Sequence, residues 1–347
     1  MKMTFRWYGP KDAVTPEMIA QIPGMTGVVS AVYDVAPGEV WPEESIAAVK
    51  NAAAAEGLAF EVVESVPVPE DIKLGNEKAP RMIENYCETV RRLGRAGVKC
   101  VCYNFMPVFD WLRSDLYKPQ PHGAHALAYD EAAVLKMDPQ KGDLNLPGWD
   151  ASYTKEELGA LLDAYKEIDE ERLWENLGVF LKKVIPAAAE AGVDLAIHPD
   201  DPPWGMFGLP RIITGEKSIE RLFSIVDVKN NGLTLCTGSL GANPENDLVD
   251  IASSFADRIH FLHLRNIKRT GVRQFEEVGH PTACGSVDVY GIAKALVDKG
   301  WDGYCRPDHG RMIWGESGKG GYGLYDRALG STYLTGLFEA LEKGKEK

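Results

Sequence analysis

Four side chains of types that bind metal ions stand near the ends of short apolar runs in the second half of the chain. They are His198 in DLAIHPDDPP, Cys236 in LTLCTG, His263 in IHFLHLRN and Asp308 in GYCRPDHG. A buried strand gains nothing from an imidazole, a thiol or a carboxylate at its end, whereas a divalent transition metal binds all three groups. The same placement on four successive runs therefore predicts one shared metal ion.

The donor set limits which metal would bind. Two imidazoles with one carboxylate suit Mn, Fe, Co, Ni or Zn, and the thiolate adds affinity for softer ions. Calcium and magnesium prefer oxygen ligands and are disfavoured. A purely structural zinc site more often uses several cysteines and closes its coordination shell. The mixed set therefore favours a catalytic site with positions open to the oxygens of a substrate.

Alternating strand and helix patterns would position these four side chains. Runs rich in Val, Ile, Leu, Phe or Tyr predict strands at residues 3–9, 27–33, 59–65, 98–105, 194–199, 233–238, 259–266 and 303–308. Helical patterns lie between them at residues 41–57, 81–97, 171–192, 217–226, 245–257, 287–299 and 326–343.

Alternation of this kind is typical of a (β/α)8 barrel, here a single domain of residues 1–347. In such a barrel the carboxyl ends of all strands face the same side, where active sites are built. The four candidate ligands belong to the last four predicted strands, so neighbouring strands would deliver them to one part of the barrel mouth. A doubly wound open sheet is the structural alternative, but no glycine-rich dinucleotide fingerprint follows the first predicted strand.

One segment interrupts the alternation. Residues 106–168 separate the fourth predicted strand from its helix and contain WLRSDLYKPQPHGAHALAYD and LNLPGWDASYTKEEL. A connection of this length is usually functional or disordered, and its aromatic residues argue against disorder. We expect a lid over the barrel mouth, with short helices near 130–137 and 155–168. A dimerisation arm is the alternative that the sequence leaves open.

Two arginines are candidate partners for a substrate carboxylate. Arg265 shares the side-chain parity of His263, and Arg306 shares that of Asp308, so both could face the barrel mouth. The guanidinium group is suited to this role because its fork binds both carboxylate oxygens. A structural ion pair is the alternative role for each arginine.

Further polar residues lie close to the four candidate ligands in the sequence. Asp200 and Asp201 follow the first of them, His309 follows the last, and His280 lies in the loop FEEVGHPTACGS. We expect Asp200 and His280 to contact substrate, with turn capping as the alternative for the aspartates. Tyr322, in the glycine-rich GYGLYDRALG after the last predicted strand, could donate or accept a proton.

Charge and composition exclude several kinds of partner. The 347 residues carry a formal net charge of −13, whereas nucleic acids and anionic membranes call for basic patches. No apolar run approaches the ~20 residues of a membrane span, and the N-terminal MKMTFRWYGP is interpreted as a strand, not a signal peptide. The six cysteines are scattered, as is typical of reduced thiols, and we therefore expect a cytoplasmic enzyme.

Several segments resemble the mannonate dehydratase family of hexuronate degradation. They are HPDDPP, LCTGSLGA, HFLHLRNIK, FEEVGHPTACGSVDVYGI and RPDHGRMIWGE with GYGLYDRALG. The resemblance runs from MTFRWYGPKDAVT to the last predicted helix. It implies a xylose-isomerase-like TIM barrel that dehydrates D-mannonate to 2-keto-3-deoxy-D-gluconate in D-glucuronate catabolism. It also implies Mn²⁺ or Fe²⁺, with no organic cofactor.

The resemblance further implies roles for particular residues. The metal ligands of the family fall on the four strand-end residues already selected, namely His198, Cys236, His263 and Asp308. Its acid and base fall on His309 and Tyr322. Which of the two takes a proton and which gives one is left open.

Two other functions are compatible with the same residues. A metal-dependent sugar isomerase would use the same barrel and metal, and a non-catalytic sugar-acid-binding protein would keep only the binding site. A phosphoesterase or endonuclease is disfavoured by the negative charge of the chain. For the assembly we expect a homo-oligomer, with a dimer favoured.

Overall fold

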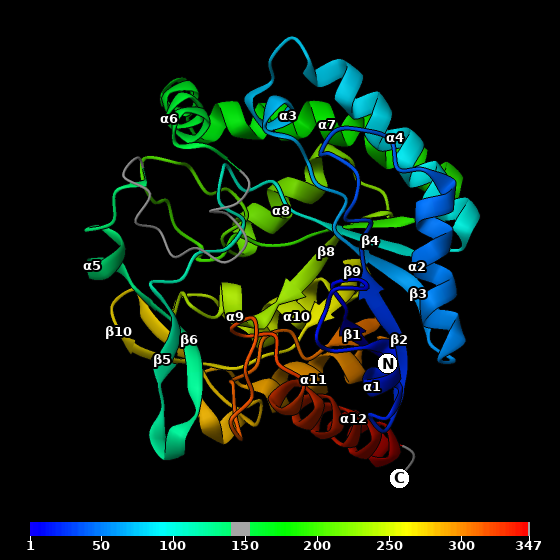
Figure 1. Ribbon diagram of the computed structural model, residues 1–347, viewed down its shortest axis with the longest axis vertical. Coiled ribbons are helices and arrows are strands. Elements are labelled where there is room, and N and C mark those ends of the chain that lie inside the picture. The colour runs from blue at the N-terminus through cyan, green and yellow to red at the C-terminus, as the bar shows by residue number, and fades with distance from the viewer. Residues whose placement is uncertain (140–152, 346–347) are drawn as a thin grey trace.

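Parallel strands close into a barrel, in the order β1–β12–β9–β8–β7–β4–β3–β2 (Figure 1). The structure is a computed structural model and describes residues 1–139 and 153–345. The barrel strands span Lys2–Arg6 (β1), Met25–Ser30 (β2), Ala59–Glu64 (β3), Cys100–Tyr103 (β4), Asp194–Ile197 (β7), Asn231–Cys236 (β8), Ile259–His263 (β9) and Tyr304–Arg306 (β12). The predicted (β/α)8 barrel is therefore confirmed, and each strand overlaps one of the predicted runs.

Several predicted strands extend too far at their carboxyl ends. The run 3–9 leaves the sheet after Arg6, and the run 259–266 leaves it after His263. The residues that follow His263 stay buried, with Leu264 0% and Arg265 1% exposed. Leu264 still donates its backbone amide to Arg306 of β12 at 3.1 Å, whereas the Arg265 amide donates to the Thr237 hydroxyl at the barrel mouth.

The inside of the barrel is filled by side chains from alternate positions of its strands. Val29, Val62, Cys100, Cys102, Ala196 and Phe261 form this inner cluster. Cys100 and Cys102 lie two residues apart on β4 and therefore face the same side. The outer faces of the strands pack beneath the helices, and strands covered on both faces are apolar along their whole length.

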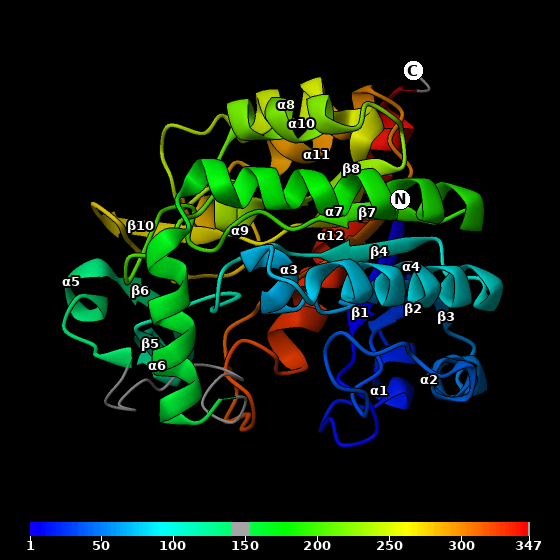
Figure 2. The same cartoon turned by 90° about the horizontal axis from the view of Figure 1, so that it is seen from above.

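Helices cover the outside of the barrel. The α-helices span Pro16–Ala20 (α1), Glu43–Ala55 (α2), Glu70–Leu74 (α3), Ala79–Ala96 (α4), Glu131–Val134 (α5), Lys155–Ala164 (α6), Glu170–Ala191 (α7), Glu216–Ile225 (α8), Thr237–Leu240 (α9), Leu248–Ser254 (α10), Val289–Asp298 (α11) and Tyr325–Lys345 (α12). Short 3-10 helices span Pro121–Gly123, Tyr165–Glu167, Ala256–Arg258 and Thr282–Cys284. Figures 1 and 2 show α4 and α7 side by side. Within residues 1–139 and 153–345, none of the helices is both long enough and apolar enough to cross a membrane.

The insertion after β4 contributes to a second sheet. Its strands β5 (Asp115–Pro119) and β6 (His125–Asp130) join β10 (Ile267–Gly271) and β11 (Gln274–Glu277), which come from the loop after β9. All pairings are antiparallel, in the order β10–β11–β6–β5. Tyr129 of β6 stacks on Phe275 of β11, with ring centroids 5.5 Å apart. Two loops that are far apart in sequence are thereby joined on the side of the barrel where the strands end.

The helices that the sequence predicts within the insertion can be compared directly. The prediction near 130–137 corresponds to α5, and the prediction near 155–168 corresponds to α6 with the 3-10 helix that follows it. Residues 140–152 of the predicted lid lie outside the described residues. Its role as a lid stays a prediction.

Candidate active site

The four predicted metal ligands come from neighbouring barrel strands. His198 follows β7 directly, Cys236 ends β8, His263 ends β9, and Asp308 lies two residues beyond β12. In the barrel order these strands are adjacent. Asp308 has a left-handed backbone with a φ of 57°, an unusual conformation that aspartate tolerates better than most residues.

These residues come together at the carboxyl ends of their strands. His198, Cys236 and His263 offer ligand atoms that all lie within 4.8 Å of one another. Asp308 adjoins them, with Oδ2 3.5 Å from the Cys236 sulfur and Oδ1 3.9 Å from Nδ1 of His263. Two imidazoles, a sulfur and a carboxylate in this arrangement suit a divalent transition metal.

The electrostatic environment favours the thiolate form of Cys236. Burial opposes ionisation of the thiol, but Arg265 and His198 outweigh burial and hold the pKa of Cys236 well below its usual value. Burial likewise opposes protonation of His198, yet the neighbouring Cys236 raises the pKa of His198 to about 9. Without a metal the two form an imidazolium–thiolate pair. A divalent cation would displace that proton, since both residues bind metals in their deprotonated forms.

A second group of potential ligands shares His263. Glu64, Cys102 and His263 also lie within 4.8 Å of one another. Burial and the nearby Glu64 carboxylate raise the pKa of Cys102 well above its usual value, so Cys102 is a neutral thiol. The Glu64 carboxylate and the Asp308 carboxylate both lie 2.8 Å from Nη2 of Arg306, so this pairing does not separate the two groups. Because the thiolate is the form that binds metals, the group containing Cys236 is the better site.

Arg265 is surrounded by three buried carboxylates. Its Nη2 lies 2.8 Å from Asp201, its Nε lies 2.6 Å from Asp308, and its Nη1 contacts Glu277. Arg113, from the insertion, binds both oxygens of Asp201 at 2.8 and 2.9 Å and contacts Glu277 at 3.0 Å. The Arg265 side chain is therefore committed to partners within the protein.

Arg306 keeps one donor available. Its Nε donates to Nε2 of His263 at 2.9 Å, and its Nη2 lies 2.8 Å from both Glu64 and Asp308. Among the described residues, its buried Nη1 has no hydrogen-bond partner. A buried donor without a partner is costly unless a ligand satisfies it.

His309 and Tyr322 are in direct contact. Nε2 of His309 and the phenol oxygen of Tyr322 are 2.8 Å apart, and Nδ1 of His309 lies 3.3 Å from Glu277. Burial would raise the pKa of Glu277, but Arg265 and His309 outweigh burial and lower it to about 2. The ionised Glu277 carboxylate can accept a hydrogen bond from Nδ1 of His309, which directs Nε2 of the same ring toward Tyr322.

Aromatic rings enclose this histidine and tyrosine. The Tyr8 ring meets Tyr322 edge-on with centroids 5.0 Å apart, and Trp111 of the insertion lies 4.9 Å from the His309 ring. Burial is the main reason that the pKa of Tyr322 lies well above its usual value. Tyr322 therefore holds its proton and is suited to donate it to a leaving group.

Two residues expected to contact substrate have partners within the protein. One oxygen of Asp200 accepts hydrogen bonds from the backbone amides of Ile212 and Ile213, at 2.6 and 2.8 Å. His280 is buried, and its Nε2 lies 2.7 Å from the carbonyl oxygen of Pro307. The first contact fixes a loop, and the second fixes the segment that carries the aspartate ligand.

Sequence reasoning missed several residues of the site. Glu277, Arg113, Trp111 and Tyr8 lie on loops or short strands whose neighbours come from distant parts of the chain. Glu64 is different, because it ends β3 and contacts His263 at 3.4 Å. The strand-end rule that selected the metal ligands would have selected Glu64 as well.

Comparison with known proteins identifies the family. The family model described as D-mannonate dehydratase (UxuA) matches residues 1–347. The chain belongs to the mannonate dehydratase family. It is therefore an enzyme, a hydro-lyase, as the resemblance in the sequence implied.

Individual relatives agree with this family. The chain is 55% identical to a mannonate dehydratase of Streptococcus agalactiae serotype III, over 100% of both chains. The crystal structure of mannonate dehydratase from Streptococcus suis serotype 2 is 48% identical, covers 100% of this chain and 96% of that one, and gives a TM-score of 0.93. A xylose-isomerase-like TIM barrel protein from Mycobacterium smegmatis, 13% identical, covers 94% of this chain and 89% of that one with a TM-score of 0.58. This last likeness confirms the xylose-isomerase-like fold alone.

Close packing around Arg265 gives a test of this arrangement. A Cβ at Gly238 would collide with the Arg265 guanidinium, so Gly238→Ala must displace that group from its three carboxylates. We expect a loss of about 1–3 kcal/mol in the free energy of unfolding, as is usual for overpacking a core. Chemical denaturation of both proteins measures the difference.

Gly336→Ala is the matched control, because a Cβ at this helical position meets nothing within 4 Å. We expect it to be neutral or to stabilise by up to ~1 kcal/mol, since alanine is the better helix former. Equal stabilities of the two variants would contradict the close packing of Arg265 against α9.

Proposed function

We propose that the enzyme converts D-mannonate into 2-keto-3-deoxy-D-gluconate and water, in D-glucuronate catabolism. It uses one divalent transition metal, Mn²⁺ or Fe²⁺, and the pair His309 and Tyr322 as base and acid. Membership of the mannonate dehydratase family supports the reaction. The observation that carries the mechanism is the 2.8 Å contact between His309 and Tyr322 next to the cluster of potential ligands.

The reaction itself sets what the site must supply. D-Mannonate loses a proton from C2 and the hydroxyl group from C3. The C2 proton is weakly acidic, because its removal places a second negative charge beside the carboxylate. The enzyme therefore needs a group that stabilises this charge, a base for C2 and an acid for the departing hydroxyl.

The donor set of the cluster fits a divalent transition metal. His198, Cys236, His263 and Asp308 would hold it, because their nitrogen, sulfur and oxygen donors adjoin one another. When bound, such an ion acts as a Lewis acid that stabilises negative charge on the oxygens of the substrate.

Hydrogen bonds favour one assignment of the proton-transfer roles. Glu277 holds Nδ1 of His309, so Nε2, the nitrogen that contacts the Tyr322 phenol, is the one that takes the C2 proton. Tyr322 keeps its own proton and gives it to the C3 hydroxyl, which leaves as water. The 2.8 Å contact then returns the proton from His309 to Tyr322. The C2 proton and the C3 hydroxyl are thereby lost as one water molecule, and both side chains return to their starting states. The product of this step is an enol, which becomes the 2-keto acid when the C2 hydroxyl gives up its proton and C3 takes one.

Arg306 is the better supported partner for the substrate carboxylate. Its buried Nη1 has no partner among the described residues, whereas Arg265 already meets three carboxylates. Arg265 would instead hold the acidic residues in place. Asp200 and His280 would act in the same way, through the backbone groups they bind.

Assembly and location follow less directly from the site. A cysteine that binds metal must stay reduced, and this supports a cytoplasmic location. The homodimer expected from the sequence stays a prediction.

A 2-keto-acid assay tests the reaction. Metal-stripped enzyme is given Mn²⁺, Fe²⁺, Co²⁺ or Zn²⁺ and is offered D-mannonate, other hexonates or D-xylose. We expect 2-keto acid from D-mannonate with Mn²⁺ or Fe²⁺. Isomerisation of D-xylose without 2-keto acid from any hexonate would instead indicate a sugar isomerase, and binding without turnover would indicate a sugar-acid-binding protein.

Replacement of the proposed base is expected to abolish turnover. His309→Asn removes Nε2 as a proton acceptor, so kcat should fall by ~10²–10⁴-fold. Metal content, measured on the same preparation, should not change. Tyr322→Phe should have a similar effect, while Tyr290→Phe, at a residue 49% exposed, serves as the matched control. A kcat close to that of the unaltered enzyme in His309→Asn would rule out this base.

Replacement of the thiolate is expected to weaken metal binding. Cys236→Ser exchanges a charged sulfur for a neutral hydroxyl, and Mn²⁺ affinity should fall by at least about 100-fold, the upper range for changes outside the ligand shell. Isothermal titration calorimetry measures the affinity directly. Cys102→Ser is the control at the neighbouring buried thiol and should retain it. The opposite result would assign the metal to the group formed by Glu64, Cys102 and His263.

A further inference from the structure

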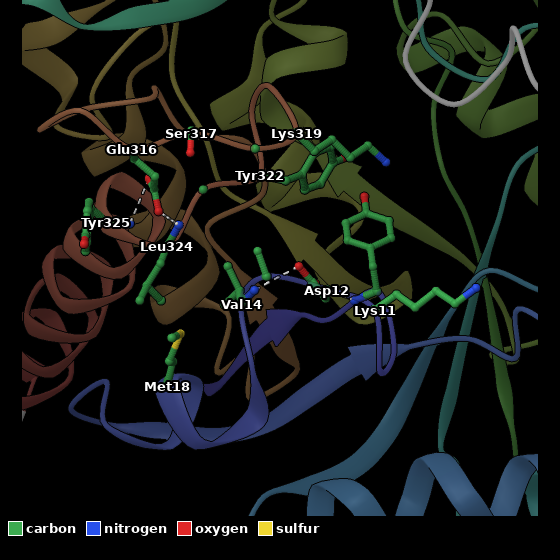
Figure 3. A pocket seen from close by; sticks show the side chains of 14 residues that line it. Lys11, Asp12, Val14, Met18, Glu316, Ser317, Lys319, Tyr322, Leu324 and Tyr325 are labelled. Atoms are coloured by element: carbon green, nitrogen blue, oxygen red, sulfur yellow. Dashed lines mark hydrogen bonds between the residues drawn. The ribbon is translucent and has the colours of Figure 1, made fainter.

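A pocket of about 450 Å³ opens beside Tyr322 (Figure 3). It lies between the loop that follows β1 and the loop that precedes α12. We call it the outer pocket. It is lined by Tyr8, Lys11, Asp12, Ala13, Val14, Met18, residues 316–319 and residues 322–325. Two of these lining residues, Tyr8 and Tyr322, also belong to the aromatic enclosure around His309. The outer pocket is therefore next to the proposed acid and base.

Two lysines at the outer pocket have no anionic partner. The Lys319 ammonium lies 4.1 Å from the centroid of the Tyr8 ring and 4.9 Å from that of Tyr322. Neither Lys319 nor Lys11 makes a hydrogen bond or ion pair with any described residue. Both side chains reach the protein surface, although the Lys319 ammonium packs against the two tyrosine rings. In Figure 3 both side chains extend to the same side, away from Glu316 and Tyr325. Both charges therefore remain available to a ligand.

The carboxylates of the outer pocket are occupied by backbone groups. Asp12 accepts hydrogen bonds from the amides of Tyr8 and Val14, at 2.8 and 3.1 Å. Glu316 accepts them from Leu324 and Tyr325, at 2.5 and 3.4 Å. These acidic side chains stabilise their own loops and are not directed at the lysines.

Two arginines add positive charge behind the tyrosine rings. The Arg6 guanidinium lies 4.5 Å from the Tyr8 ring centroid, and that of Arg327 lies 5.6 Å from the Tyr322 centroid. The outer pocket thus combines cationic side chains with aromatic walls in a chain whose net charge is −13. Positive charge at a cleft favours the approach of an anion.

We propose that the outer pocket is the route by which the anionic sugar acid reaches the acid and base, and that Lys319, assisted by Lys11, attracts it electrostatically. The inference rests on the proposed function, because it takes the substrate to be a monocarboxylate sugar acid. Lys319 is a positioning residue and takes no part in the chemistry. Its effect falls on capture of the substrate and so on kcat/KM, since charges that line a cleft accelerate association.

The electrostatic attraction by Lys319 depends on pH, because the lysine must be protonated to carry its charge. Desolvation, followed by repulsion from Arg6, lowers the pKa of Lys319 to about 8. The positive charge is therefore present below pH 8 and is lost above it. The charged and titratable groups that face it are Arg6, Tyr8, Lys11, Asp12, Tyr322 and Arg327. The pKa of Tyr8 is raised to about 12, mainly by burial, so this neighbour stays neutral across that range.

Steady-state kinetics of Lys319→Gln on D-mannonate tests the proposal. We expect kcat/KM to fall by about 5- to 10-fold at ~0.1 M salt, at the low end of electrostatic steering, with kcat unchanged. The difference should vanish near 1 M salt, where the Debye length shrinks from ~10 Å to ~3 Å. Lys182→Gln is the matched control, because Lys182 is an exposed lysine of α7 outside the outer pocket. It should leave kcat/KM and its salt dependence unchanged.

Lys319→Arg separates charge from shape. Arginine keeps its charge at high pH, so kcat/KM of this variant should stay constant as the pH rises above 8. The kcat/KM of the unaltered enzyme should fall over the same range, because Lys319 loses its charge. A purely structural role for Lys319 would not produce this pH-dependent ratio.

The outcomes distinguish this inference from the proposed function. Turnover of D-mannonate by the unaltered enzyme, with equal kcat/KM and salt dependence in Lys319→Gln, overturns the inference alone. No 2-keto acid from the unaltered enzyme overturns the proposed function. In that case, D-mannonate affinity is measured by calorimetry. A 5- to 10-fold weaker, salt-sensitive affinity in Lys319→Gln would still support the outer pocket as an anion route, and an unchanged affinity would overturn it.

Discussion

The site depends on the contacts between Arg265 and three carboxylates, each from a different part of the chain. Asp201 follows β7, Glu277 ends β11, and Asp308 follows β12. All are nearly inaccessible to water, where an unpaired charge is strongly destabilising. The arginine therefore fixes the relative positions of Asp308, next to the candidate metal ligands, and Glu277, which contacts the proposed base His309. Arg113 completes this arrangement from the insertion. One guanidinium group thus connects the two halves of the proposed chemistry.

Much of the fold could be predicted because the barrel strands are buried on both faces and so form apolar runs. The same property indicated the candidate metal ligands, since a polar side chain at the end of such a run is conspicuous. His198, Cys236 and His263 lie one, two and three residues before the ends of their predicted strands. The structure brings their ligand atoms within 4.8 Å of one another. Parity along the strand also indicated that both arginines face inward, but it could not tell which of them keeps a free donor.

The remainder depended on contacts that no local pattern contains. Strands β5 and β10 have mostly exposed or half-exposed residues, so neither forms an apolar run. The second sheet pairs Phe275 with Tyr129, residues separated by most of the intervening barrel. Glu277 acquires its role only through this pairing, which is why its sequence position suggested nothing. Glu64, by contrast, could have been found from the sequence, because it is the last charged residue of the predicted strand 59–65 and lies one residue before its end.

The pairing of β6 with β11 has a consequence for protein engineering. Peripheral loops of a barrel are often treated as modules that can be exchanged between enzymes while the scaffold is kept. Here the strand that carries Glu277 is hydrogen-bonded to a strand of the insertion. Grafting a foreign loop in place of residues 106–168 would remove Arg113 and the neighbour of that strand together. The transplant would have to bring its own counter-charge, or the His309 imidazole would lose its orientation even though none of the candidate metal ligands had been altered.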